Sequence, residues 1–347
     1  MKVTVKNKYL NVRVDKPSVN APCYQYLAPG SELEVDGTLY KGDLYENADT
    51  WYKDEAGNYY WSGGVNEISA VNLENGGKWW LNNYKIPELW NMGLTGKGVK
   101  IAVLDTGISY PHPDLILNQK FLYDVTNSPS GYQDKEGHGT HCTGIIKASY
   151  NGIGPTGIAY NADVYTCKIT HDKAGDDSSY LADALAWAIT QQVDIISISK
   201  GSAIDDKSVE TQIKVAKSKG ILIVAAAGNI VSGYPHDHIY YPARYDGVLS
   251  VGGVDENNLV LSDSILTGET KIFAPGKNIL STYLNSGYCS LTGSSQATPF
   301  VAGVCALLLE NKRKNEPSFK AIDIQNTLLS KADSLVQIKI INPKNSI

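Results

Sequence analysis

Four nearly unbroken apolar runs constrain the fold of this chain more than any other feature. They are short and rich in Ile, Val and Leu, and they cover residues 100–104, 163–167, 194–198 and 221–224. Longer stretches of helical character, 179–191 and 207–219, lie between them. Strands that are apolar on both faces and alternate with helices predict a parallel sheet with helices on both sides. We therefore expect an α/β domain whose functional site lies beyond the carboxyl ends of its strands.

Length and charge narrow the class of protein. The chain has 347 residues, with 31 Lys and Arg against 36 Asp and Glu, and a formal net charge of −5. A hydrophobic content of 42% with 19% charged residues is typical of a folded globular protein. The mild acidity argues against a nucleic-acid-binding protein, which usually carries a basic stripe. The longest apolar run, 300–309, is about half the length of a membrane span, so we expect no such span.

The N-terminus and the cysteines leave the compartment open. Residues 1–8 alternate apolar and polar side chains and lack the apolar segment of a signal peptide. Read literally this indicates a cytoplasmic protein, although a secreted protein whose signal has been removed would look the same. The cysteines are odd in number, so at least one is a free thiol unless it pairs between chains. They are Cys23, Cys142, Cys167, Cys289 and Cys305.

Residues 1–66 have a different pattern from the rest of the chain. They are rich in Tyr, Trp and Val, and turn residues interrupt them at short intervals. The runs between these turns predict short strands at 3–5, 10–14, 32–35 and 51–53. No helical stretch alternates with them, which predicts a small all-β module. Residues 67–78 are polar and contain a Gly-Gly pair, which predicts a linker to a larger domain over 79–347.

Three segments of the larger domain carry residues suited to amide hydrolysis. The run 100–104 leads into Asp105-Thr106-Gly107, His138 lies in a Gly-His-Gly-Thr-His segment, and Ser295 lies in Gly-Ser-Ser-Gln-Ala-Thr-Pro. Nucleophilic hydrolysis of an amide needs a hydroxyl, a base that takes its proton and a carboxylate that orients the base. Pro299 predicts that a helix starts close behind Ser295, with Pro299 in its first turn and the positive end of its dipole at the nucleophile.

Together with Ala227-Gly228-Asn229, these motifs resemble the subtilisin-like serine proteases, the subtilase or peptidase S8 family. The resemblance extends from about residue 79 to the C-terminus and includes the family's order of Asp, His and Ser. Residues 1–66 resemble a bacterial SH3-like barrel through Asn11-Val12-Arg13, Trp51-Tyr52 and Trp61. The predicted fold is therefore a subtilisin-like α/β domain preceded by a small SH3-like β-barrel.

The resemblance implies a serine endopeptidase that needs no catalytic cofactor. Ser295 is then the nucleophile, and His138 is the general base that later protonates the leaving amine. Asp105 holds the His138 ring in the correct tautomer. The side-chain amide of Asn229 and the backbone N–H of Ser295 then stabilise the oxyanion.

The resemblance also implies a substrate site and a structural metal ion. Residues Ser199, Lys200 and Gly201 pair with an extended substrate, and Ala227 and Gly228 line the pocket for the residue before the cut. The family usually has an apolar residue at position 200. Lys200 therefore either favours an acidic or polar substrate residue or points to solvent.

A tight calcium site is expected from side-chain oxygens of Asp114 and Asn151. Carbonyl groups of the loop 150–154 and the side chain of Asn75 are further candidate ligands. The ion would be structural rather than catalytic.

Four features depart from the family's usual pattern. Ser294 replaces a Thr, and Gln296 stands where many members have an oxidisable Met. Cys142 follows His138 on the same predicted helix and is either a small core residue or a thiol whose modification inhibits the enzyme. Residues 1–66 lack the α/β pattern of the family's folding propeptide.

Single motifs also match other kinds of protein. Asp-Thr-Gly after a strand is typical of aspartic proteases, but these need a second such motif in an all-β chain. His138, His141 and Cys142 have side chains that bind zinc, but no further ligand cluster follows at a suitable spacing, and the resemblance makes His141 a structural residue. Residues 152–157 match G-x-G-x-x-G, but they contain Pro155 and no helix follows them.

Two other functions stay open. A subtilase without catalytic activity could bind a peptide or a partner protein in the same cleft. The SH3-like module could anchor the protein to a cell-wall or peptide ligand, or it could cover the active site as a built-in inhibitor. The expected partners are protein or peptide substrates and not nucleic acids.

Overall fold

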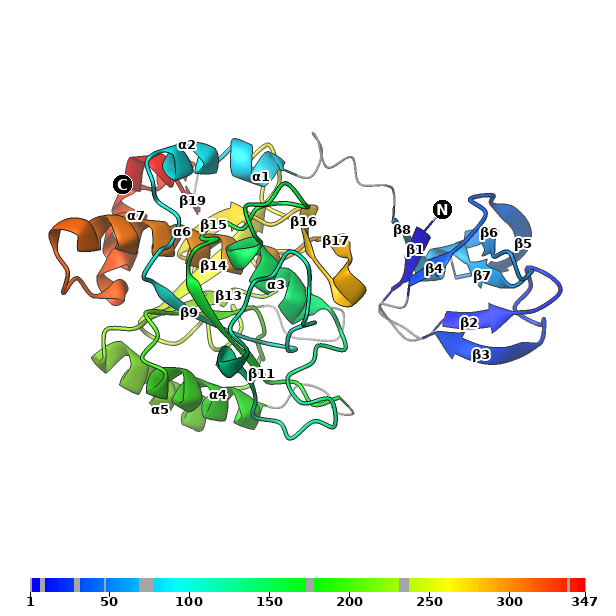
Figure 1. Cartoon of the computed structure of the whole chain (residues 1–347), viewed down its shortest axis with the longest axis horizontal. Helices are drawn as coiled ribbons and strands as arrows, with labels where there is room; N and C mark the ends of the chain where they lie inside the picture. The colour runs from blue at the N-terminus through cyan, green and yellow to red at the C-terminus, as the bar shows by residue number, and fades with distance from the viewer. Residues whose placement is uncertain are drawn as a thin grey trace. The chain divides into compact units, whose positions relative to one another are not determined.

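The computed structural model describes residues 2–6, 10–27, 32–46, 48–68, 78–172, 178–230, 237–335 and 338–346. The chain divides into two compact units, residues 1–72 and 73–347 (Figure 1). The predicted linker lies largely outside the described residues, since 69–77 are not among them.

The N-terminal unit consists of two antiparallel sheets. One has the strand order β4-β1-β8, formed by β4 (Glu32–Glu34), β1 (Lys2–Val5) and β8 (Val65–Ile68). The other has the order β3-β2-β7-β6-β5, formed by β3 (Cys23–Leu27), β2 (Leu10–Arg13), β7 (Tyr59–Trp61), β6 (Ala48–Lys53) and β5 (Tyr40–Tyr45). A single 3-10 turn, η1 (Ser62–Gly64), is the only helical element described in this unit. The described residues thus confirm the all-β prediction, and the SH3-like barrel stays a prediction.

The core of the N-terminal unit is small and built from Val, Leu and Tyr. Its buried members are Val3, Val5, Leu10, Val12, Val35, Tyr52, Tyr60 and Val65. Strands β1 and β2 each place alternate residues in this core, as the period of two of a β-strand requires.

The C-terminal unit has a nine-stranded sheet with the order β10-β11-β9-β12-β13-β14-β15-β19-β18. Its strands are β9 (Lys100–Asp105), β10 (Leu122–Asp124), β11 (Asp163–Lys168), β12 (Ile195–Ile198), β13 (Leu222–Ala226), β14 (Val248–Val254), β15 (Ile272–Pro275), β18 (Asp333–Leu335) and β19 (Ile338–Ile340). All neighbours are parallel except β18 and β19. All four predicted runs are strands of this sheet, which confirms the α/β prediction.

Helices cover both faces of the sheet. They are α1 (Trp79–Asn82), α2 (Ile86–Asn91), α3 (His138–Lys147), α4 (Ser178–Thr190), α5 (Lys207–Ser218), α6 (Ser294–Asn315) and α7 (Ile324–Lys331). The remaining elements are the hairpin of β16 (Ile279–Thr282) and β17 (Tyr288–Leu291) and the 3-10 turns η2 (Gln119–Phe121), η3 (Leu284–Ser286), η4 (Ala321–Asp323) and η5 (Lys344–Ser346). None of the described helices is long and apolar enough to cross a membrane.

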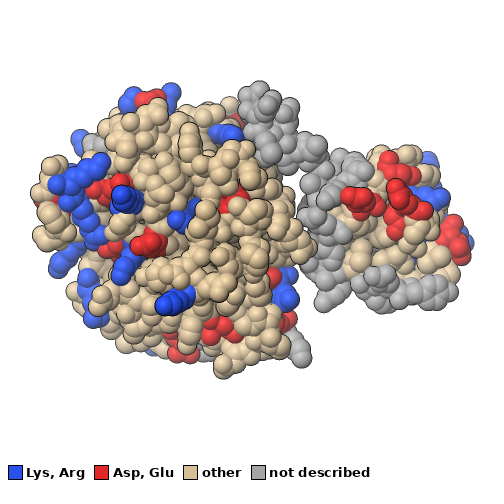
Figure 2. Space-filling model, viewed as in Figure 1, with Lys and Arg blue, Asp and Glu red and all other residues tan. Residues whose placement is uncertain are grey.

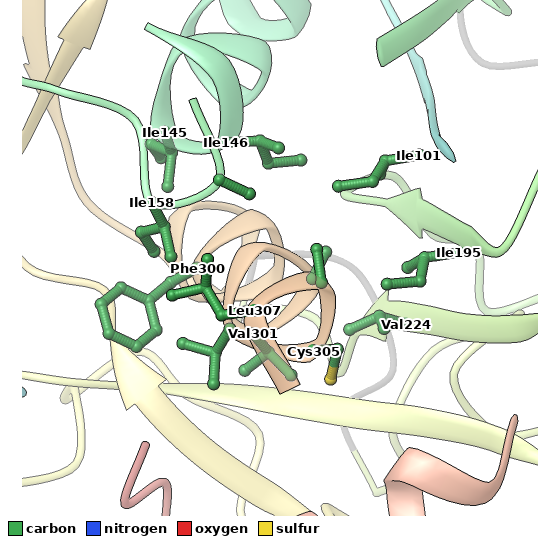
Figure 3. Packing of buried hydrophobic residues seen from close by; sticks show 14 of the residues in the cluster. Ile101, Ile145, Ile146, Ile158, Ile195, Val224, Phe300, Val301, Cys305 and Leu307 are labelled. Atoms are coloured by element: carbon green, nitrogen blue, oxygen red, sulfur yellow. The ribbon is translucent and has the colours of Figure 1, made fainter. Parts of the chain in front are cut away.

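Alternate residues of the central strands enter two separate cores. In β9, Ile101 and Val103 pack in the core that contains α3 and α6, whereas Ala102 and Leu104 pack in the core of α4 and α5. Figure 3 shows the first core, where Val301 and Leu307 of α6 lie close to residues of α3 and of the strands. This double burial explains why the strands read as continuous apolar runs.

The start of α6 differs from the prediction. The helix begins at Ser294, so Pro299 lies inside the helix rather than in its first turn. Proline has no backbone N–H to donate to the carbonyl four residues earlier, which here is that of Ser295. That carbonyl instead accepts hydrogen bonds from Ser199 Oγ at 2.8 Å and from Cys142 Sγ at 3.5 Å. Tertiary contacts therefore replace the missing helical bond.

Candidate active site

The predicted site residues lie at strand ends and helix starts. Asp105 is the last residue of β9, Ser199 directly follows β12, and Asn229 lies shortly after β13. His138 is the first residue of α3, and Ser295 is the second residue of α6. The parallel strands β9, β12 and β13 are adjacent, so these residues lie at one edge of the sheet.

Asp105 and His138 form a hydrogen-bonded pair in which only the Asp105 side chain is buried. His138 Nδ1 lies 2.7 Å from Asp105 Oδ1, and the N–H of Thr106 donates to the same oxygen at 2.8 Å. The Asp105 side chain is 1% exposed and that of His138 is 26% exposed. Since Nδ1 faces the carboxylate, Nε2 of His138 is the nitrogen that can take a proton from a nucleophile.

The electrostatics of this pair favour its charged form. Burial alone lowers the pKa of His138, but the negative charge of Asp105 and the hydrogen bond between them raise this pKa well above its ordinary value. Burial alone raises the pKa of Asp105, but the charge of His138 and the hydrogen bond hold this pKa below its ordinary value. Lys200 lowers the pKa of Asp105 further, so its charge acts on the centre of the site.

Ser295 and Ser199 are joined by two hydrogen bonds. Ser295 Oγ donates to the backbone carbonyl of Ser199 at 2.9 Å, and Ser199 Oγ donates to the carbonyl of Ser295 at 2.8 Å. In this conformation the hydroxyl proton of Ser295 points at Ser199. The hydroxyl would have to turn away from Ser199 before its proton could reach His138, and hydrogen bonds of this kind often differ between free and substrate-bound sites.

Asn229 is held through both ends of its side-chain amide. Its Oδ1 accepts from the Ser294 N–H at 3.2 Å and from Ser294 Oγ at 2.6 Å. Its Nδ2 donates to Asp263 Oδ2 at 2.9 Å. An amide nitrogen has two N–H groups, and within the described part of the chain the second one has no acceptor.

The expected substrate segments lie beside these residues. Ser199 is 6% exposed, while Lys200 is half-buried and lines a cavity of about 120 Å³ with Ile204, Tyr241 and other residues. Ala227 is buried and directly precedes Gly228, which has a φ of +102°. A Cβ at position 228 would lie 2.7 Å from the Tyr240 ring. Both the backbone conformation and the space therefore require glycine there.

Asp114 is the centre of the expected calcium site. It is fully buried, and it accepts from the Ser149 N–H at 3.1 Å and from the Tyr288 hydroxyl at 3.3 Å. Burial raises the pKa of Asp114 to about 6, although a hydrogen bond from the Asn151 side chain opposes this shift. Among the described residues its hydrogen-bond donors are neutral, so the negative charge lacks a compensating cation. A buried carboxylate without a compensating cation is the kind of hard oxygen ligand that calcium prefers. Asn75, a further candidate, lies outside the described residues.

Cys142 and His141 lie on the same helix but have different surroundings. Asp105, His138 and Cys142 have ligand atoms within 4.8 Å of one another, and they form the one such group found among the described residues. His141 does not join them, because its Nε2 lies 2.9 Å from the carbonyl of Ile279 and 3.0 Å from that of Cys289. Burial lowers the pKa of His141 to about 3, so it is a neutral structural residue, as expected.

Sequence reasoning missed two acidic residues of the site. Asp134 is 5% exposed and accepts hydrogen bonds from the Thr106 hydroxyl and from the N–H and hydroxyl of Thr140, which fixes the start of α3. Asp263 contacts Asn229, and no motif surrounds it in the sequence. Asp134 lies three residues before Gly137, the N-cap residue of α3, so it is outside the position of an ordinary capping residue. Neither position 134 nor position 263 carries a sequence signal for its contacts.

Comparisons with known proteins give a consistent result. The model of the subtilase family, peptidase S8, matches residues 96–344. The chain is 42% identical over 257 residues to subtilisin Savinase of Lederbergia lenta, which covers 74% of this chain and 91% of that protein. It is also 42% identical over 257 residues to an alkaline protease of Alkalihalobacillus alcalophilus.

The relatives differ in how much of their length is matched. The alignment covers 65% of the Alkalihalobacillus protease. The minor extracellular protease Epr of Bacillus subtilis (strain 168) is 41% identical over 231 residues, which cover 67% of this chain and 35% of that protein. The chain thus spans less than two thirds of the length of both proteins.

Proposed function

The chain belongs to the subtilase family, peptidase S8, and on that basis we propose that it is a serine endopeptidase that acts through Asp105, His138 and Ser295. The observation that carries this proposal is the 2.7 Å contact between Asp105 and His138 Nδ1 at the sheet edge where α6 presents Ser295. This contact leaves Nε2 as the basic nitrogen of an oriented imidazole.

The reaction proceeds in two halves. The Ser295 hydroxyl turns from Ser199 to His138 Nε2, gives up its proton there and attacks the carbonyl carbon of the substrate. The tetrahedral intermediate collapses when His138 passes this proton to the leaving amine, and an acyl-enzyme remains. A water molecule then repeats the sequence, with His138 again as base and then as acid, and releases the new carboxyl group.

The oxyanion forms next to two donors of this chain. These are the second N–H of Asn229 Nδ2 and the backbone N–H of Ser295, which lies at the positive end of α6. In subtilisin itself, loss of the corresponding Asn is known to cost roughly 10²–10³ in kcat, and we expect the same order for Asn229→Ala.

The substrate lies in an extended conformation along Ser199, Lys200 and Gly201 and pairs with them by β-addition. Ala227 and Gly228 line the pocket for the residue before the cut. The charge of Lys200 contributes to lowering the pKa of Asp105, which supports an effect of Lys200 on the site and on an acidic or polar substrate residue.

Calcium is the metal ion that the site at Asp114 and Asn151 would hold. When bound, it would balance the buried carboxylate and stabilise the fold without taking part in catalysis. Asp114 accepts two hydrogen bonds from Ser149 and Tyr288, which hold its carboxylate in place.

The N-terminal unit would act as an SH3-like ligand-binding module. Its aromatic side chains support this role: Tyr45 is 48% exposed and packs edge-on against Trp61, and Lys53 lies over the rings of Tyr40 and Tyr59. A cell-wall or peptide ligand is expected. Sedimentation of the full-length Ser295→Ala protein with purified peptidoglycan tests this role, and no retention would argue against a cell-wall ligand.

In Figure 2 most of the visible face of the C-terminal unit is uncharged, and the basic side chains that gather toward its left side have acidic side chains among them. This distribution supports protein or peptide substrates over nucleic acid.

A fluorophosphonate probe tests the catalytic proposal directly. Such probes react with an activated serine hydroxyl, and the intact mass reports the adduct. We expect one adduct on the protein and none on the Ser295→Ala variant. Folded protein that forms no adduct, with or without added calcium, would instead support the alternative of an inactive, peptide-binding subtilase.

A further inference from the structure

The side-chain amide of Asn229 is hydrogen-bonded at both its oxygen and its nitrogen. Only the partner of the oxygen, Ser294, belongs to a motif identified in the sequence. Ser294 donates two hydrogen bonds to Oδ1, at 3.2 Å and 2.6 Å. On the other side Nδ2 donates to Asp263 Oδ2 at 2.9 Å. The three contacts together fix which end of the amide is nitrogen and where that nitrogen points.

The backbone holds Asp263 in this place. Asn229 forms an isolated antiparallel bridge with Ser264, and the N–H of Ile230 donates to the carbonyl of Asp263 at 2.6 Å. Ser264 and Ile265 are both buried, which anchors the segment, whereas Asp263 is half-buried. Asp263 therefore reaches Nδ2 from a segment that is itself fixed on the core.

We propose that Asp263 is a positioning residue of the oxyanion hole, an inference that rests on the proposed function. By accepting one N–H of Asn229, it directs the other N–H toward the oxyanion. Without this acceptor, the contacts that the structure describes hold the amide through Oδ1 alone, and its nitrogen can rotate about the Ser294 contacts. A donor stabilises an oxyanion only when it is already oriented as the charge develops.

The carboxylate has a second effect with the opposite sign. A donor lies about 2.7–3.1 Å from the oxyanion that it serves. The negative charge of Asp263 is therefore one hydrogen bond beyond the oxyanion and opposes its formation. The positioning effect needs only an acceptor oxygen, whereas the opposing effect needs the charge. Asparagine at position 263 keeps the acceptor oxygen and removes the charge, so the two effects can be separated.

A double-mutant cycle tests the proposal. The variants are Asp263→Ala, Asp263→Asn, Asn229→Ala and the double variant Asp263→Ala with Asn229→Ala, all in the full chain. The readouts are kcat and KM on a neutral peptide substrate, together with the melting temperature. Asp246→Ala is the matched control, because Asp246 is 93% exposed and contacts Lys217.

We expect Asp263→Ala to lower kcat roughly tenfold with KM changed less than about twofold, by analogy with the cost of removing residues that orient functional groups. Asp263→Asn should keep the wild-type kcat or exceed it. In the Asn229→Ala background, Asp263→Ala should change kcat less than about twofold, because Asp263 acts through Asn229. Asp246→Ala should behave as wild type.

Three results would overturn the inference. The first is an equal loss of kcat from Asp263→Ala in both backgrounds. The second is a rise in kcat for Asp263→Ala, which would show that the carboxylate only opposes the formation of the oxyanion. The third is a loss in Asp263→Asn as large as in Asp263→Ala. If the wild type is active and any of these results is found, only the role of Asp263 is rejected. If the wild type neither turns over substrate nor reacts with the fluorophosphonate, the proposed function is rejected as well.

Discussion

Ser199 and Ser295 bind one another reciprocally, each hydroxyl donating to the other's backbone carbonyl at 2.8–2.9 Å. One of these bonds exists because Pro299 cannot supply the N–H that would otherwise reach the Ser295 carbonyl within α6. The residue that begins the expected substrate strand is therefore tied to the first turn of the helix that carries the nucleophile. In the proposed mechanism, this pair links substrate binding to the position of the nucleophile.

Removal of the Ser199 hydroxyl should weaken this link. We expect Ser199→Ala to lower the free energy of unfolding by about 1–2 kcal/mol, because among the described residues the carbonyl of Ser295 then keeps the weak Cys142 thiol as its one donor. Urea unfolding followed by circular dichroism measures the loss. In a Pro299→Ala background the carbonyl gains a helical N–H, so the same substitution should cost less. Equal losses in the two backgrounds would contradict this explanation.

The activity should depend on a basic group with a raised pKa. Catalysis needs neutral His138, whereas the charge of Asp105 favours the protonated form and raises the pKa of His138 well above its ordinary value. We therefore expect kcat/KM to fall as the pH drops, with a midpoint above the usual value of about 6.5. A pH profile from 5 to 10 with a neutral substrate measures it. A rate that is flat from pH 8 to pH 5 would exclude His138 as the base.

Asp134 should be as important for the site as the residues of the motifs. Its carboxylate accepts from the N–H groups of Gly137 and Thr140 and from the hydroxyls of Thr106 and Thr140. We expect Asp134→Ala to cost about 3 kcal/mol or more of unfolding free energy, because several buried donors lose their acceptor. Thermal unfolding measures this cost. A melting temperature within about 2 °C of wild type would show that the start of α3 does not depend on Asp134.

The sequence predicts best those parts of the fold whose signal is local. Burial on both faces of the sheet makes β9 and β13 continuous apolar runs, so they are readable without any tertiary information. Strand β5 is not predicted because every residue of it is exposed or half-buried and it contains Gly42. A Cβ there would collide with the backbone carbonyl of Pro17 and lie 2.7 Å from the Trp51 ring, and these packing contacts are not visible in the sequence.

The same distinction applies to the site. Asp105, His138 and Ser295 lie in sequence motifs whose residue types indicate nucleophilic hydrolysis. Asp263 gains its place through a backbone bridge between Asn229 and Ser264, and a contact of this kind leaves no pattern in the sequence. The start of α6 was misplaced for a related reason, since tertiary donors satisfy the carbonyl that a proline at position 299 leaves unpaired.

Calcium should stabilise the protein, and the effect should depend on pH. Without the ion, the pKa of Asp114 is raised to about 6 from an ordinary value of about 4. A raised carboxyl pKa means that the folded state binds a proton more tightly than the unfolded state. The contribution of Asp114 to stability is therefore present at low pH and is lost as the pH rises from about 4 through about 6.

A calcium ion replaces that proton and should restore the lost stability above pH 6. We expect millimolar calcium to raise the melting temperature at pH 8 and to have little effect at pH 5, where the proton competes for the carboxylate. Asp114→Asn removes the charge and should abolish the calcium response, whereas Asp246→Ala, at an exposed carboxylate, should keep it. A calcium response of equal size in Asp114→Asn would show that the ion binds elsewhere. No response in the wild type would show that the Tyr288 and Ser149 contacts satisfy this carboxylate by themselves.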